Sequence, residues 1–201
     1  SLKENLSSGT FVIVDQFIDR TINRKKSFFD EGIVAHVPMA KPVSKELMDA
    51  SKLILSNLNY PYSYGGTYLA MEGPQFSTYA ESNLYRKINC DVIGMTNMPE
   101  AKLAREAEIR YCSISMVTDY DCWHSEHDSV DLSLLIKTLN DNVDKSKNFI
   151  KDFANHYYKN INFSDDNTST VLDTSIITPM DSWDINKEKQ LTNILRRFKS
   201  K

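Results

Sequence analysis

Three short segments combine polar, charged and aromatic side chains at places where buried strands are predicted to end. They span residues 71–81, 94–100 and 118–123. In open α/β sheets, ligands bind outside the carboxyl ends of the strands. The first two segments also open predicted helices, whose N-termini favour anionic groups. We therefore expect these three segments to carry the chemistry of the protein.

Two carboxylates, Asp119 and Asp121, directly follow the predicted strand over 111–118. A charge at the end of a buried strand is costly unless it is paired or used. A carboxylate accepts hydrogen bonds from an amino group, whereas a protonated carboxyl group donates one. The two aspartates therefore predict a site that recognises a polar ligand or transfers a proton. The structural alternative is that both carboxylates cap the turn that follows them.

The elements that must position these segments follow from the pattern of apolar residues. Runs typical of buried strands span 11–15, 67–71, 91–95 and 111–118. Amphipathic or capped runs predict helices over 45–58, 79–88, 98–108, 129–158 and 185–198. The stretches 19–42 and 164–170 are polar or rich in breakers and predict loops.

Strands that alternate with helices predict an α/β layered fold. Ser44 suits an N-cap, Thr78 with Glu81 matches a capping box, and Asn97 with Glu100 repeats that pattern. The 201 residues are enough for one domain with a core, and no internal repeat is present. We therefore expect a single domain over 1–201.

The composition excludes several classes of function. The net charge of −3 argues against a general nucleic-acid binder, and the basic stretches at 24–26 and 196–199 are interpreted as solvated faces. No apolar run approaches the roughly 20 residues that cross a bilayer, and no signal peptide is visible. The three cysteines lack metal-ligand spacing and predict a reducing compartment. We expect a cytoplasmic location, with the nucleus as a second compartment.

The three segments, in this order and spacing, resemble the trimeric purine nucleoside phosphorylase family. They read Met-Glu-Gly-Pro-Gln-Phe-Ser from Met71, Met-Thr-Asn-Met-Pro-Glu from Met95, and Thr-Asp-Tyr-Asp-Cys-Trp from Thr118. The stretches 13–21 and 36–40 add support, and the similarity runs from the first residue to about residue 150. The resemblance implies a phosphorylase/hydrolase-like fold with a mixed central sheet flanked by helices, incomplete at the N-terminus.

Ser77 and Asp119 point to the methylthioadenosine branch of this family. Relatives that cleave 6-oxopurines carry Glu and Asn at these positions, which match a ring N–H and a 6-oxo oxygen. Ser77 and Asp119 fit adenine better than hypoxanthine or guanine. The resemblance implies a pentosyltransferase that converts 5′-methylthioadenosine and phosphate into adenine and 5-methylthioribose 1-phosphate, in purine and methionine salvage.

Two alternatives stay open. One is a broader-specificity purine nucleoside phosphorylase that accepts adenosine or inosine. Asn97 departs from the Thr expected in its motif, and changes at Ser77 or Leu132 would widen specificity. The other is a truncated, non-catalytic remnant that binds nucleosides. The resemblance places a glycine-rich phosphate loop and an Arg-His pair ahead of the position of Ser1, and neither is found here. We therefore expect this chain alone to be inactive and to expose an unpaired sheet edge.

The resemblance also assigns roles to individual residues. Asp119 is the acid at N7 of the base and must keep its proton near neutral pH. Asp121 binds the amino group or orients Asp119. Phe76 covers the base, Met95 lies against the ribose and Thr96 binds phosphate, although a lone Phe or Met is more often core. The other substrate-binding residues that the resemblance implies are Ser77, Tyr120 and, for the 5′ group, Val130, Leu132, Leu135 and Ile136.

The implied assembly is a homotrimer in which a neighbouring subunit closes the 5′ pocket. His36 matches the histidine contributed by that neighbour, and Gln190 or Leu191 is the candidate for a second contributed residue. Inorganic phosphate is a co-substrate, and no cofactor is expected. No metal is expected either, because His124 and His127 lack a third ligand.

Overall fold

The computed structural model describes residues 1–124, 132–160 and 167–198, apart from the side chains of 132–135 and 158–160. The strands are β1 (Phe11–Val14), β2 (Gln16–Asp19), β3 (Tyr62–Tyr64), β4 (Thr67–Ala70), β5 (Val92–Gly94) and β6 (Ser113–Met116). The α-helices are α1 (Lys45–Asn57), α2 (Tyr79–Lys87), α3 (Glu100–Glu106), α4 (Leu132–Asn160) and α5 (Ile185–Gln190). Short 3-10 helices are η2 (Thr168–Asp173), η3 (Met180–Ser182) and η4 (Arg196–Phe198).

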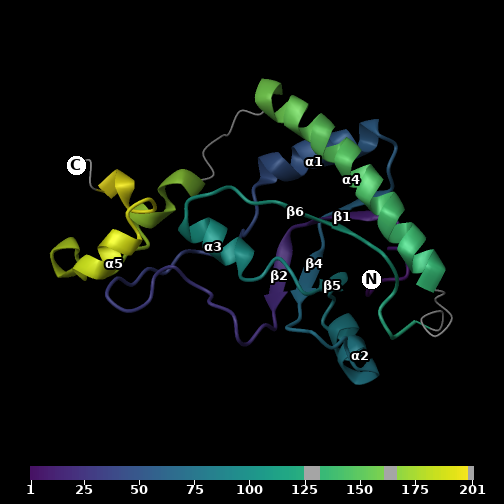
Figure 1. The fold of residues 1–201 in the computed structure, drawn as a ribbon, viewed down its shortest axis with the longest axis horizontal. Coiled ribbons are helices and arrows are strands. Elements are labelled where there is room, and N and C mark those ends of the chain that lie inside the picture. The colour runs from purple at the N-terminus through teal and green to yellow at the C-terminus, as the bar shows by residue number, and fades with distance from the viewer. Residues whose placement is uncertain (125–131, 161–166, 199–201) are drawn as a thin grey trace.

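The structure contains two three-stranded sheets (Figure 1). The chain bends between β1 and β2 and again between β3 and β4, and these two bends join the sheets. The order of the first sheet is β3-β1-β6 and that of the second is β2-β4-β5. Only Asp15 separates β1 from β2, and its Oδ1 accepts a hydrogen bond of 2.9 Å from the nitrogen of Gly66, which lies between β3 and β4. The parallel pairing of β1 with β3 thus continues as that of β2 with β4. Because β6 runs antiparallel to β1, the strand arrangement is mixed, as predicted.

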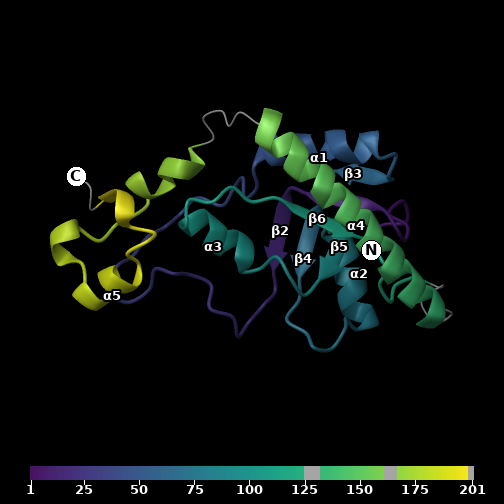
Figure 2. The ribbon, with the colours of Figure 1, turned by 45° about the horizontal axis from the view of Figure 1, so that its top comes forward.

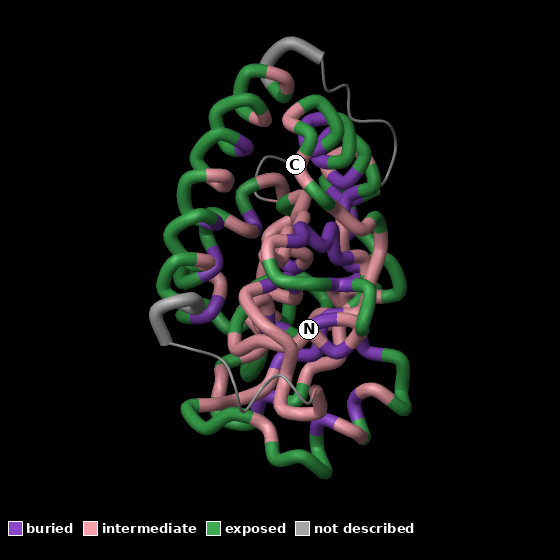
Figure 3. Tube along the Cα trace, turned by 90° about the vertical axis from the view of Figure 1, so that its right-hand side faces the viewer, coloured by how far each residue is buried: buried purple, intermediate pink, exposed green. Residues whose placement is uncertain are grey.

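Strand β1 is buried on both faces, as its continuous apolar sequence predicted. Val12 and Val14 pack into a cluster with Tyr68 of β4. Phe11 and Ile13 point into a second cluster, formed with helices α1 and α4. These two helices cover one side of the first sheet (Figures 1 and 2). The outer side of α4 is exposed (Figure 3). No helix of the described chain is long and apolar enough to cross a membrane.

Two of the three predicted helix caps are confirmed. The Ser44 side chain accepts from the nitrogen of Leu47, and Thr78 forms the predicted capping box. The cap at Asn97 is wrong, because α3 begins after Pro99 with no side-chain cap. Asn97 has a φ of 68°, and its Oδ1 accepts a hydrogen bond of 3.1 Å from the Tyr111 hydroxyl. Its side-chain oxygen is therefore bonded to Tyr111 and does not cap α3.

Strands β2 and β3 were not predicted from the sequence, and two segments near the C-terminus differ from their predicted structure. Strands β2 and β3 are short and contain exposed positions, so pairing with β4 and β1 defines them rather than their own composition. Thr168 belongs to a 3-10 helix and is buried, with a hydrogen bond of 3.0 Å from Arg105. The predicted helix over 185–198 ends at Gln190, because Leu191 and Leu195 turn into an apolar cluster with the 28–37 stretch.

The carboxylate of Asp19, at the end of β2, is a source of pH-dependent stability. Partial burial opposes its charge, but hydrogen bonds from Lys102 at 2.5 Å, from Thr21 and from Lys26 outweigh this and hold its pKa well below the usual 3.8. A depressed pKa stabilises the fold above the ordinary pKa, and this stabilisation is lost as the pH falls through the native pKa.

Asp19→Asn is therefore expected to lower stability at pH 7 by about 1–2 kcal/mol. The difference from the unaltered protein should shrink below about pH 4. Thermal unfolding between pH 3 and 7 measures it. Asp144→Asn, which changes an exposed carboxylate on α4, is the control and should change little at any pH. A deficit for Asp19→Asn that is independent of pH would contradict the assignment.

Candidate active site

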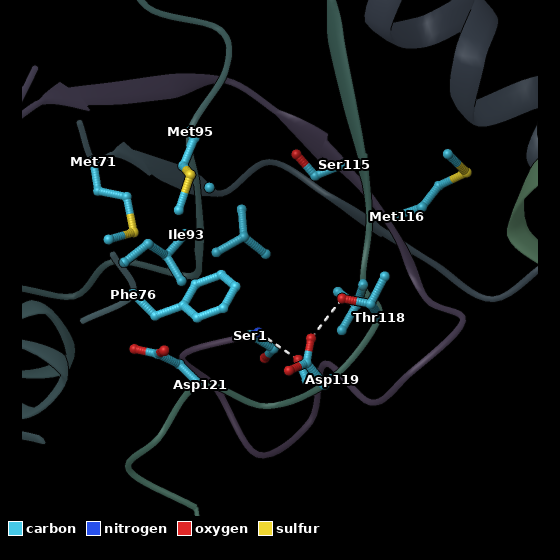
Figure 4. A pocket seen from close by; sticks show the side chains of 13 residues that line it. Ser1, Met71, Phe76, Ile93, Met95, Ser115, Met116, Thr118, Asp119 and Asp121 are labelled. Carbon is cyan, nitrogen blue, oxygen red and sulfur yellow. Dashed lines mark hydrogen bonds between the residues drawn. The ribbon is translucent and has the colours of Figure 1, made fainter. Parts of the chain in front are cut away.

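A cavity of about 340 Å³ lies between the end of β5 and the end of β6 (Figure 4). All three segments singled out from the sequence contribute to it. The residues that line it include Phe76, Ile93, Met95, Thr118, Asp119 and Asp121. Segments distant in sequence thus meet at one site. Strands β4 and β5 pair within one sheet, and β6 pairs with β1 in the sheet that the bend at Asp15 joins to it.

Phe76, Ile93 and Met95 give the cavity an apolar wall. The Phe76 side chain is 84% exposed, and Figure 4 shows its ring beside Ile93 and above the two aspartates. This exposure excludes core packing as its role. Met95 approaches Gly73 so closely that a Cβ there would lie 2.6 Å from the Met95 sulfur. Gly73 also has a φ of 71°, which side chains rarely adopt.

Asp119 presents a partly engaged carboxylate at the cavity. Its Oδ1 accepts a hydrogen bond of 2.5 Å from the Thr118 hydroxyl. Its carbonyl oxygen accepts one of 2.7 Å from the nitrogen of Ser1. No described residue donates to Oδ2, so this oxygen remains available to a ligand. Figure 4 shows both hydrogen bonds.

Asp121 has a buried oxygen, Oδ2, with no hydrogen-bond partner among the described residues. Its backbone nitrogen donates to the Ser1 carbonyl oxygen at 2.9 Å, and the Trp123 indole donates to the same oxygen at 2.9 Å. Buried carboxylate oxygens are rarely left without a donor. Among the described residues neither aspartate side chain caps the following turn, so the structural alternative is not observed. The cavity at Asp121 therefore suits a ligand that donates a hydrogen bond.

Arg24 supports the loops beside the cavity, a role that was not predicted from the sequence. Its guanidinium donates to the carbonyl oxygens of Met95 at 2.8 Å and Met98 at 2.6 Å, and to those of Glu72 at 3.1 Å and Met71 at 3.4 Å. It therefore ties the loop after β4 to the loop after β5. The side chain is only 24% exposed, so the prediction of a solvated basic run is wrong for this residue. No local sequence signal distinguishes it from its basic neighbours.

Three other predicted residues of these segments do not line the cavity. Thr96 lies in the loop ahead of α3 and contacts the Tyr68 hydroxyl. The Ser77 carbonyl oxygen accepts a hydrogen bond of 3.4 Å from the Cys122 sulfur. The Tyr120 hydroxyl donates to the Glu4 carbonyl oxygen at 2.9 Å, and its ring stacks on His124.

His36 and the two C-terminal candidates also lie outside this cavity. His36 is exposed, and its backbone nitrogen donates to the Ser175 carbonyl oxygen at 2.8 Å. Leu191 is 5% exposed within its apolar cluster, whereas Gln190 is exposed. Of the two, only Gln190 has a side chain on the surface of the chain.

The predicted wall for the 5′ group falls largely outside the described part of the chain. Val130 and the side chains of Leu132 and Leu135 are not covered. Ile136 lies on α4 and is 50% exposed. Among the described residues no three or more His, Cys, Asp or Glu side chains are grouped to hold a metal ion. His127 lies outside that range, and His124 lies 3.2 Å from the Glu4 carboxylate.

The sequence pattern of the Phosphorylase superfamily matches residues 1–155, which is most of the chain. The chain belongs to this superfamily. An S-methyl-5′-thioadenosine phosphorylase of Rhodospirillum rubrum is 52% identical over 197 residues, which cover 98% of this chain and 67% of that relative. The family resemblance inferred from the three segments is therefore confirmed, as is the expectation of a transferase.

Solved structures of phosphorylases support the same assignment. A methylthioadenosine phosphorylase from an antarctic soil metagenomic library has a TM-score of 0.91 and 39% identity, and the match covers 97% of this chain and 68% of that one. A variant adenosine/methylthioadenosine phosphorylase of Schistosoma mansoni, solved with methylthioadenosine, has a TM-score of 0.75 and 27% identity over 80% of this chain and 62% of that one. The predicted phosphorylase fold is confirmed.

Proposed function

We propose that this phosphorylase acts on 5′-methylthioadenosine, with adenine and 5-methylthioribose 1-phosphate as products. The observation that carries the proposal is the meeting of Phe76, Met95, Asp119 and Asp121 in one cavity. An exposed aromatic ring beside two partly unsatisfied carboxylates suits an adenine base, which is flat and carries both donors and acceptors. The relatives named for the same reaction support the choice of substrate.

Recognition of the base rests on Phe76 and Asp121. The Phe76 ring covers one face of the adenine, which explains why so large an apolar side chain is left exposed in the free protein. The 6-amino group donates to Oδ2 of Asp121, the buried oxygen that no described residue satisfies. Met95 contacts the ribose. A 6-oxo base offers an acceptor in place of the amino group, so hypoxanthine and guanine are disfavoured.

The chemical step rests on Asp119. The bond between C1′ and N9 breaks, its electron pair leaves with the base, and a phosphate oxygen forms the new bond at C1′. Asp119 donates a proton to N7, which neutralises the charge that gathers on the departing adenine. Thr118 engages Oδ1 and so leaves Oδ2 as the oxygen that carries the transferred proton.

The remaining groups act outside this cavity. The exposed hydroxyl of Thr96 donates to the phosphate. In a homotrimer, His36 and Gln190 of one subunit reach the 5′ pocket of the next, and Ile136 with its neighbours on α4 forms the apolar wall of that pocket. Phosphate is a co-substrate and no cofactor takes part. The proposed setting is purine and methionine salvage in the cytoplasm and nucleus.

Adenine release by the natural protein that contains this chain tests the proposal. Chromatography follows the bases released from methylthioadenosine, adenosine and inosine, each with and without phosphate. We expect release that depends on phosphate and the highest kcat/KM for methylthioadenosine. Equal or faster turnover of inosine would identify a broader purine nucleoside phosphorylase. Calorimetric binding of adenine that is unaffected by phosphate, without turnover, would identify a non-catalytic nucleoside-binding protein.

A further inference from the structure

The hydroxyl of Tyr68 meets the loop that follows β5 at Thr96. Tyr68 lies on β4 and is 4% exposed, whereas Thr96 is exposed. The Tyr68 oxygen lies 3.1 Å from the Thr96 Oγ1 and accepts a hydrogen bond of 3.2 Å from the Thr96 nitrogen. One buried hydroxyl thus contacts both polar groups by which Thr96 could hold a ligand.

Gly94 makes this contact sterically feasible. A Cβ built on Gly94 would overlap the hydroxyl oxygen of Tyr68. The strand β5 therefore leaves a space at its last residue, and the Tyr68 hydroxyl fills it. The pairing of a glycine with a tyrosine on the adjacent strand brings the hydroxyl to the loop.

The hydrogen-bonding capacity of the two hydroxyls determines where their protons go. A hydroxyl has one proton and two acceptor lone pairs. The Tyr68 oxygen already accepts from the Thr96 nitrogen, and its own proton can be donated to the Thr96 Oγ1. The proton of the Thr96 hydroxyl is then free to be donated to an anion. The Thr96 nitrogen already donates to Tyr68, so the hydroxyl is the group of Thr96 that remains for phosphate.

Residues on both sides of Thr96 are held by side chains from outside the loop. Arg24 binds the carbonyl oxygens of Met95 and Met98, and Tyr111 binds the Asn97 side chain. Because the backbone on both sides of Thr96 is fixed, the Tyr68 contact selects the orientation of the Thr96 side chain. A group fixed in advance loses less entropy when it binds a ligand.

We propose that Tyr68 is a positioning residue that orients the Thr96 hydroxyl as a donor to the phosphate co-substrate. The inference rests on the proposed function, since it assumes that Thr96 binds phosphate. Tyr68 does not contact the substrate. It acts through Thr96, and its effect falls on phosphate and not on the nucleoside.

Tyr68→Phe in the natural protein tests the inference, because it removes only the hydroxyl and keeps the ring in the core. Steady-state kinetics with phosphate varied at saturating methylthioadenosine should show a rise of about tenfold in the KM for phosphate. The KM for methylthioadenosine and the kcat should change less than about twofold. Tyr62→Phe, which removes from β3 of the other sheet a hydroxyl that contacts Ser56, is the matched control and should leave all three constants unchanged.

A double-mutant cycle shows whether Tyr68 acts through Thr96. In a Thr96→Val background, Tyr68→Phe should produce no further rise in the KM for phosphate. Additive effects of the two changes would overturn the inference, and so would equal losses for both substrates. An unchanged KM for phosphate in Tyr68→Phe, with normal turnover, would also overturn it and leave the proposed function standing. If the unaltered protein shows no phosphate-dependent turnover, the proposed function itself fails.

Discussion

Asp119→Asn is expected to lower the kcat for phosphorolysis of methylthioadenosine by about 10²–10⁴-fold, the range for loss of a positioned proton donor. The amide has nearly the shape of the carboxyl group, and its oxygen can still accept from Thr118. It cannot transfer a proton to N7. The KM for the nucleoside should change much less than the kcat, because the wall that contains Phe76 and Met95 is untouched. Steady-state kinetics at saturating phosphate measures both constants.

The control for this prediction is Asp181→Asn, which removes an exposed carboxylate on η3, far from the cavity in sequence. It should leave the kcat unchanged. If Asp119→Asn retains full activity while its melting temperature matches that of the unaltered protein, Asp119 is not the acid. The assignment of this cavity as the active site would then be wrong.

Arg24→Met is expected to produce the largest combined loss of stability and affinity. Removal of the guanidinium leaves four carbonyl oxygens, two from each loop, without their donor. Hydrogen bonds to charged groups each contribute about 1.5–3 kcal/mol, and their effects within one cluster are not additive. We expect a loss of about 2–4 kcal/mol in the free energy of unfolding. Urea denaturation measures it.

The same substitution should raise the KM for methylthioadenosine by about tenfold. A tenfold change in affinity corresponds to about 1.4 kcal/mol of binding free energy. The two loops carry Met71 and Met95, so their separation sets the width of the cavity. Arg24→Lys should recover only part of the loss, because an ammonium group lacks the fork that reaches several carbonyls.

Lys25→Met is the matched control, because it removes the adjacent positive charge from a side chain that is 71% exposed. It should alter neither stability nor KM. An Arg24→Met variant with normal stability and normal KM would show that the loops keep their positions without this clamp.

Arg24 and Tyr68 show a common feature of the proposed site. Neither side chain lines the cavity, yet each binds the loop that carries Met95 and Thr96. Supporting groups of this kind keep binding residues near their productive positions. Changes at these two positions are therefore expected to alter kinetics in a protein whose cavity residues are all intact.

Much of the fold followed from local sequence pattern. The apolar run at β1 predicted a strand buried on both faces, and the polar caps at Ser44 and Thr78 predicted where α1 and α2 begin. These features depend on neighbours within one or two turns of chain, so the sequence alone expresses them. The three segments also identified the family, because the order and spacing of their residues can be read directly from the sequence. Together they predicted Phe76, Met95, Asp119 and Asp121 as one site, and these residues do line one cavity.

Other features depended on contacts between distant parts of the chain. Strands β2 and β3 are defined by pairing across the bend at Asp15. Asn97 has the sequence signature of a cap, but Tyr111 takes its side-chain oxygen.

Arg24 and Tyr68 carry no local signal at all. Their partners lie between 28 and 74 positions away, and only the packing of distant segments brings them together. The sequence by itself determined the family and four of the residues that line the cavity. The tertiary structure decided which groups hold those residues in place, because such support is made of long-range contacts.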